Sequence, residues 1–62
     1  MYKILIVDDD KDIQIALSEI IKTEGYEAIV AGDGRKALKE IRTHAPDLVL
    51  LDLKLPGMDG ME

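Results

Sequence analysis

The chain has 62 residues, about half the length of a typical domain, and it contains no cysteine, which excludes both a disulfide framework and a cysteine-based zinc site. Its uninterrupted apolar runs reach only four residues, too few to span a membrane, and Met1 does not begin a signal-peptide pattern. Thirteen acids against eight bases give a net charge of −5, which argues against nucleic acid or an anionic membrane as partner. We therefore expect a small, acidic, cytoplasmic α/β unit.

The first element is predicted to be a strand over residues 3–7, because Ile4–Val7 is continuously apolar and rich in β-branched side chains. Three aspartates follow, and Asp10 is expected to cap a helix over residues 11–24. Gly25 is expected to end that helix. One apolar stripe recurs at helical spacing in this segment, formed by Ile13, Ala16, Leu17, Ile20 and Ile21.

The second half of the chain predicts a strand over residues 26–31, a turn in which Asp33 caps a helix over residues 34–44, and an apolar strand over residues 47–53. Pro46 stops the second helix and moves the residue before it out of the α region. His44, near the end of this helix, is expected to be solvated rather than to act as a ligand.

The order β-α-β-α-β, with continuous apolar strands, predicts a parallel sheet with right-handed crossovers. If the first strand is central, the strand order is 2-1-3 and the two helices cover opposite faces. The sequence ends before a third helix, which would leave the strand over residues 47–53 as an open apolar edge. Such an edge invites pairing with another chain.

Carboxylates are expected to gather at one end of this sheet, because Asp8 and Asp9 follow the first strand and Asp52 ends the third. The carboxyl ends of these strands are neighbours at the topological switch point, where ligands usually bind. Converging carboxylates repel one another unless a cation or a proton joins them, and hard oxygen ligands suit Mg²⁺. A carboxylate beside Mg²⁺ can also act as a nucleophile towards a phosphoryl group, and Asp52 is the best candidate.

Two segments carry a resemblance to a known family. Residues 4–10, ILIVDDD, and residues 47–60, DLVLLDLKLPGMDG, resemble the receiver domain of two-component response regulators. The resemblance covers essentially the whole chain but only about the first half of the family's domain. It implies a flavodoxin-like doubly wound parallel sheet, truncated here before the third helix. The 2-1-3 order also belongs to that family, so it is not independent of the resemblance.

The resemblance implies a role for each matching residue. Asp52 matches the phosphoacceptor, Asp9 the direct Mg²⁺ ligand, and Asp8 its acidic neighbour, which reaches the ion mainly through water. The backbone carbonyl of Lys54 matches the third protein ligand. Three further residues match the loop that shapes the entrance, namely Pro56, Gly57 and Gly60. The partner implied is a histidine kinase or a phosphotransfer protein, and the role is that of a phosphoacceptor, not an enzyme.

The family also holds the phosphoryl oxygens with a Ser or Thr after its fourth strand and a Lys after its fifth. These 62 residues contain no counterpart of either, so we expect Mg²⁺ binding with weak phosphorylation.

Other interpretations stay open at this point. The chain could be an engineered or proteolytic half-domain that forms a homodimer through its third strand and has no signalling activity. Asp8 and Asp9 could serve only to cap the helix. A haloacid-dehalogenase-like phosphatase would use Asp8 as nucleophile and Asp10 as acid and base, but this assignment leaves Asp52 unexplained.

Overall fold

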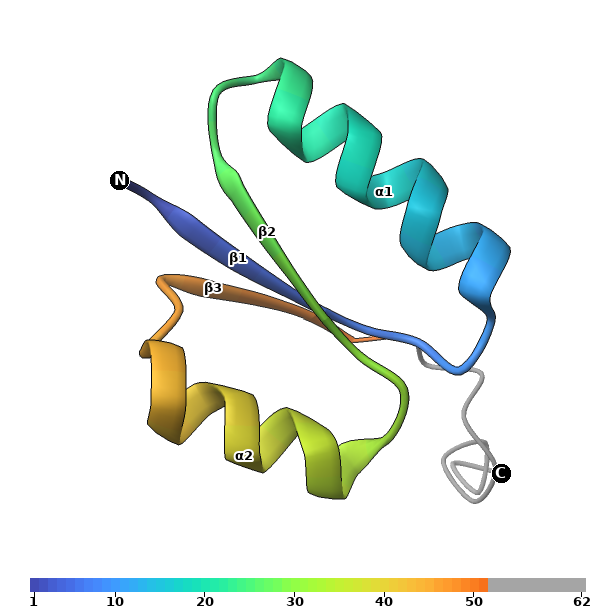
Figure 1. Ribbon diagram of the computed structural model, residues 1–62, viewed down its shortest axis with the longest axis vertical. Coiled ribbons are helices and arrows are strands. Elements are labelled where there is room, and N and C mark those ends of the chain that lie inside the picture. The colour runs from blue at the N-terminus through green and yellow to red at the C-terminus, as the bar shows by residue number, and fades with distance from the viewer. Residues whose placement is uncertain (52–62) are drawn as a thin grey trace, which may run out of the picture.

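A computed structural model describes residues 1–51 as a sheet covered by a helix on each face (Figure 1). Within that range the sheet has three parallel strands, β1 (Lys3–Val7), β2 (Glu27–Ala31) and β3 (Leu48–Leu51), in the order β2-β1-β3. The predicted element order and strand order are therefore confirmed. The register aligns Val7 of β1 with Ala31 on one side and with Leu51 on the other, so the three strands end level with one another.

The two helices, α1 (Lys11–Thr23) and α2 (Gly34–His44), lie on opposite faces of the sheet (Figure 1). Because side chains alternate along β1, its residues divide between two buried clusters. Those on the α2 face are Leu5 and Val7, which pack with Ala31 and Ala37. Those on the α1 face are Ile4 and Ile6, which pack with Ile21. The central strand is thus buried on both sides, as its apolar sequence predicts.

Helix α1 begins at the predicted cap and ends one residue earlier than predicted. The Asp10 carboxylate accepts hydrogen bonds from the backbone N–H groups of Asp12 and Ile13, at 2.8 and 3.4 Å. At the other end Gly25 adopts a positive φ of 91° and donates its N–H to the carbonyl of Lys22 at 2.9 Å. This conformation favours glycine and forms a Schellman-type helix end.

The predicted start of β2 at Tyr26 is wrong by one residue. The Tyr26 N–H donates to the carbonyl of Ile21 at 3.1 Å and so belongs to the cap of α1. The backbone N–H of Glu27 instead donates to the carbonyl of Tyr2, the residue before β1, at 2.9 Å, and Glu27 pairs with Lys3.

Helix α2 is capped by Asp33, whose carboxylate accepts the Lys36 N–H at 2.8 Å, and it ends at His44 as predicted. Ala45 follows with φ 48° and ψ 61°, in the left-handed region, and Pro46 comes next. The residue before the proline therefore leaves the right-handed helical region, as expected, but it does not become extended.

The third strand begins at Leu48, one residue later than predicted, and Asp47 before it forms two hydrogen bonds with the start of β1. The Asp47 carboxylate accepts the Lys3 N–H at 2.7 Å, and the Asp47 N–H donates to the Lys3 carbonyl at 2.8 Å. Residues 52 and 53 of the predicted strand lie outside the described range.

Strand β3 packs against β1 but against neither helix. Its four side chains, Leu48–Leu51, are between 36% and 49% exposed. On α1 the predicted apolar stripe is only partly buried, since Ile20 is 60% exposed and Ala16 is also exposed. The reason is that α1 packs over β1 and β2 and leaves its β3 side uncovered. Neither described helix has the length and apolarity needed to cross a bilayer.

Candidate functional site

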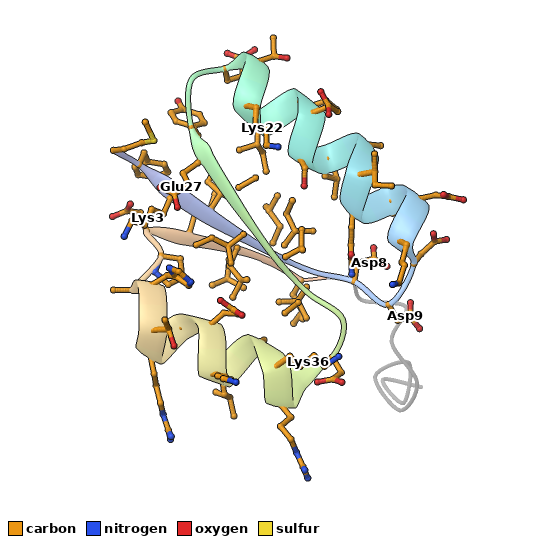
Figure 2. The ribbon with its side chains drawn as sticks, viewed as in Figure 1. Lys3, Asp8, Asp9, Lys22, Glu27 and Lys36 are labelled. Carbon is orange, nitrogen blue, oxygen red and sulfur yellow. The ribbon has the colours of Figure 1, made fainter. Side chains whose placement is uncertain are left out.

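Asp8 and Asp9 lie directly after β1, at the turn into α1 (Figure 2). Their environments differ sharply, because Asp8 is only 4% exposed whereas Asp9 is exposed. The Asp8 N–H donates to the carbonyl of Ala31 at 3.1 Å, which continues the pairing of β1 and β2 by one step. The backbone of Asp8 is therefore held by the sheet, and its side chain leaves from a fixed point.

The Asp8 carboxylate also closes the turn, because it accepts the Asp10 N–H at 2.9 Å. Asp8 therefore stabilises the turn that precedes α1, whereas the residue that caps the helix is Asp10. The Asp8 carbonyl in turn accepts a hydrogen bond from the side-chain amide of Gln14 in the first part of α1. This contact of Gln14 was not predicted from the sequence. The feature that could have indicated it is a side-chain amide four residues after the cap residue Asp10.

Burial of Asp8 raises the question of what balances its charge. In the described part of the chain the contact between a basic and an acidic side chain is that of the His44 imidazole with Glu40 at 3.2 Å, so no described basic group lies within 4.0 Å of the Asp8 carboxylate. A buried carboxylate without a basic partner is costly, and a bound cation removes that cost. The donor set at this turn is made of hard carboxylate oxygens, which fits Mg²⁺.

The third predicted carboxylate follows β3. Val7 pairs with Leu51, and the next residues in the sequence are Asp8 and Asp52. Asp52 itself lies outside the described residues, as do Lys54, Pro56, Gly57 and Gly60. Within residues 1–51 there is no group of three metal-ligating side chains. The structure thus places Asp8 and Asp9 at the expected strand end and leaves the rest of the predicted site untested.

His44 lies at the other end of the sheet, at the last residue of α2. Its carbonyl accepts a hydrogen bond from the Lys3 ammonium at 3.2 Å, and its imidazole faces Glu40 of the same helix. Lys3 and Asp8 mark opposite ends of β1 (Figure 2). His44 therefore belongs to the packing of a helix end and lies away from the carboxylates.

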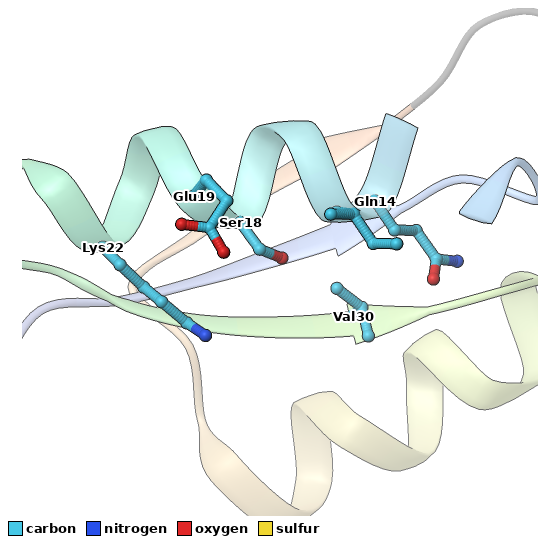
Figure 3. Close-up of a pocket in the computed structure, with 6 residues that line it drawn as sticks. Gln14, Ser18, Glu19, Lys22 and Val30 are labelled. Carbon is cyan, nitrogen blue, oxygen red and sulfur yellow. The ribbon is translucent and has the colours of Figure 1, made fainter. Parts of the chain in front are cut away.

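A shallow groove of about 230 Å³ lies between α1 and β2 (Figure 3). Its lining is mixed in character and consists of Gln14, Ile15, Ser18, Glu19, Lys22 and Val30. Only Gln14 connects it to the Asp8 turn. One acid and one base face this groove, whereas the turn after β1 carries the two neighbouring acids Asp8 and Asp9.

Comparison with known proteins assigns the chain to a family. The response regulator receiver domain family matches residues 4–62. This chain is a receiver domain sequence. The match includes both segments on which the resemblance rested, and it favours the receiver over the haloacid-dehalogenase-like alternative.

Curated relatives of this receiver include sporulation initiation phosphotransferase F of Bacillus subtilis (strain 168), which is 53% identical over 60 residues. That alignment covers 97% of this chain and 48% of the relative. The DNA-binding response regulator MtrA of Mycobacterium tuberculosis (strain ATCC 25618 / H37Rv) is 48% identical over 60 residues, covering 97% of this chain and 26% of MtrA.

The crystallised chemotaxis protein CheY4 of Vibrio cholerae superposes on this receiver with a TM-score of 0.86 and 36% sequence identity. The superposition covers 94% of this chain and 48% of CheY4. The predicted flavodoxin-like fold is therefore confirmed. This receiver spans about half the length of CheY4 and of the sporulation phosphotransferase.

Proposed function

We propose that this receiver binds Mg²⁺ through Asp8, Asp9, Asp52 and the Lys54 backbone carbonyl, and that Asp52 accepts a phosphoryl group. The single observation that supports this most strongly is the burial of Asp8 without a basic partner among the described residues, next to the exposed Asp9. A relative at 53% identity is named a phosphotransferase, which agrees with phosphoryl transfer as the shared chemistry. The phosphoryl donor would be a histidine kinase or a phosphotransfer protein.

Each residue has a distinct role in this proposal. Asp8 is held by its hydrogen bonds to β2 and to the turn, so its carboxylate would supply negative charge at a fixed position in the site. Asp9 is exposed and free to bind directly. Bound Mg²⁺ supplies positive charge that offsets the carboxylates and the phosphoryl oxygens. The Asp52 carboxylate attacks phosphorus, the bond to the donor's imidazole nitrogen breaks, and an aspartyl phosphate results. Pro56, Gly57 and Gly60 would shape the entrance.

Metal binding is tested by following backbone amide signals by NMR while MgCl₂ is added at millimolar concentration. We expect shifts at residues 8–14, and we expect Asp9→Asn and Asp52→Asn each to weaken binding by at least about tenfold. Asp12→Asn is the matched control, because Asp12 is an exposed acid in the first turn of the same helix. Equal weakening by Asp12→Asn, or unchanged wild-type spectra up to tens of millimolar, would contradict the proposal.

Phosphorylation of the 62-residue polypeptide taken by itself is proposed to be weak. The family's hydroxyl and lysine partners of the phosphoryl oxygens have no counterpart in these residues, so charge on the phosphoryl group would be offset less completely. Incubation with acetyl phosphate, followed by mass spectrometry, measures the fraction that gains a phosphoryl group. Stoichiometric modification at Asp52 under conditions that modify a complete receiver would refute this expectation.

A second property is favoured by a separate observation, the exposure of all four β3 side chains at a strand edge that has no partner strand within residues 1–51. We propose that the 62-residue polypeptide self-associates into a homodimer through β3. A cytoplasmic location and the absence of nucleic-acid binding also stay predictions for these residues. MtrA is described as DNA-binding, and this receiver spans only 26% of it.

A further inference from the structure

Helix α2 differs in charge from the rest of the chain. Residues 34–44 hold four of the eight bases and one of the thirteen acids, a net charge of +3. The remaining residues hold four bases and twelve acids, a net charge of −8. A basic helix on an acidic protein is thus a local feature and does not follow from the overall composition.

The cations of α2 are concentrated on the side that faces away from the sheet. Arg35, Lys39 and Arg42 are spaced four and three residues apart, which places them in one row about 10 Å long. We call these three residues the basic row. All three are exposed, and nitrogen-tipped side chains project from α2 away from the sheet (Figure 2). Within residues 1–51 the basic side chain that contacts a carboxylate is His44, which faces Glu40, so the basic row has no described carboxylate partner.

An apolar side chain lies within the same surface. Leu38 is 60% exposed, and it lines a groove of about 430 Å³ together with Thr43 and the basic row. The buried side of α2 is formed by Ala37, which packs against β1 and β2. The groove is therefore an outer surface of the helix, and it combines three cations that have no carboxylate partner in residues 1–51 with one aliphatic contact.

We propose that this groove binds a short acidic polypeptide segment that presents one aliphatic side chain to Leu38. Opposite charge attracts the segment and raises the rate at which it associates, and the contact with Leu38 fixes its position on the helix. A nucleic acid fits less well, because the rest of the surface is strongly acidic and Tyr2 and Tyr26, the chain's two aromatic residues, pair with each other elsewhere. An anionic membrane fits less well because the row is a few side chains long and adjoins one aliphatic side chain.

The test uses a fluorescent peptide of about ten residues in which glutamates surround a single leucine, and a control peptide in which glutamine replaces every glutamate. Fluorescence anisotropy measures affinity, and NMR amide shifts locate the contact. We expect binding of the acidic peptide alone, weakening as salt rises, with the largest shifts at residues 35–43. Shifts centred on another element would overturn the proposal.

Matched variants distinguish an effect of the basic row from an effect of the overall charge of the protein. Arg35→Gln combined with Arg42→Gln removes two charges from the row, and Lys11→Gln combined with Lys22→Gln removes two charges from α1. We expect the first pair to weaken binding by about tenfold or more and the second to change it by less than about threefold. Equal losses would overturn the proposal. Circular dichroism establishes that each variant keeps its helices.

Leu38→Ser tests the apolar part of the groove and is expected to weaken binding by about threefold to tenfold. Unchanged affinity would show a diffuse charge effect and would overturn the proposal. Phosphatidylcholine–phosphatidylserine vesicles and duplex DNA serve as competing ligands in the same assay. Binding of either one more tightly than the acidic peptide would also count against an acidic polypeptide as the partner.

Discussion

Asp8 combines a structural and a proposed functional role in one carboxylate, and substitutions can separate them. Asp8→Asn keeps an acceptor for the Asp10 N–H but removes a buried charge. Asp8→Ala removes both. Without Mg²⁺ we expect Asp8→Asn to be at least as stable as the wild type, and Asp8→Ala to be about 1–2 kcal/mol less stable than Asp8→Asn.

Urea unfolding in a chelating buffer measures these differences in the free energy of unfolding. The control uses the same two substitutions at Asp9, which is exposed, so alanine and asparagine there should differ by less than about 0.5 kcal/mol. If Asp8→Ala unfolds at the same urea concentration as Asp8→Asn, the turn does not depend on a side-chain hydrogen-bond acceptor at this position.

Residues whose partners are local could be predicted from the sequence, and residues with distant partners could not. Asp10 and Asp33 cap helices that begin one residue later, so spacing alone identified them. Asp47 binds the backbone of Lys3, which is 44 residues away in sequence, and no local pattern indicates such a pair. Gln14 reaches back six residues to the Asp8 carbonyl, and no local sequence pattern distinguishes it from any other helical glutamine.

At the scale of the elements, the end of α2 stores conformational strain that glycine would remove. Ala45 is the non-glycine residue with positive φ in residues 1–51, at φ 48°. Ala45→Gly is therefore expected to stabilise the fold by about 0.5–1 kcal/mol, since left-handed backbone costs alanine more than glycine. Ala16→Gly, on the exposed side of α1, should instead destabilise it by about 1 kcal/mol.

Thermal or urea unfolding of the two variants gives the sign directly. The same chemical change at two exposed alanines should move stability in opposite directions, because only one alanine lies in the left-handed region. Loss of stability in Ala45→Gly would mean that chain entropy outweighs strain at this helix end.

Element type followed closely from sequence, but burial did not. The apolar period of α1 indicated the right helix and the right core side chain in Ile21, yet Ile20 of the same stripe is exposed. Apolar periodicity records which side chains favour burial, and the covering element decides which of them are buried. The same reason explains β3, whose sequence is as apolar as that of β1 while all four of its side chains are exposed.

The whole molecule has two unlike edges, and this contrast predicts how it associates. On the β2 side both flanking grooves contain charged side chains from the helices, among them Lys22 and Lys36. On the β3 side the exposed strand residues are all aliphatic. We expect the 62-residue polypeptide to form dimers at about 10–100 μM through β3, since an exposed strand edge with uncharged side chains promotes pairing.

Sedimentation velocity measures this association. Leu50→Lys places a charge on β3 and should yield monomers. Val30→Lys is the matched control, because Val30 is a similarly exposed aliphatic residue on β2, at the opposite edge. Dimers that persist in Leu50→Lys, or a wild-type polypeptide that stays monomeric throughout this range, would exclude the β3 interface.

The central position of β1 has a consequence for synthesis on the ribosome. This strand is synthesised before both of its partners, which end at Ala31 and Leu51. After β2 is complete, a further twenty residues must therefore be added before β3 can pair with the other edge of β1. At about 5–20 residues per second that interval is roughly 1–4 s, far longer than the microseconds in which paired strands form. For those seconds the nascent chain presents Ile4–Val7 with one edge unpaired. Chaperones that recognise extended aliphatic segments therefore have a defined period in which to bind this strand.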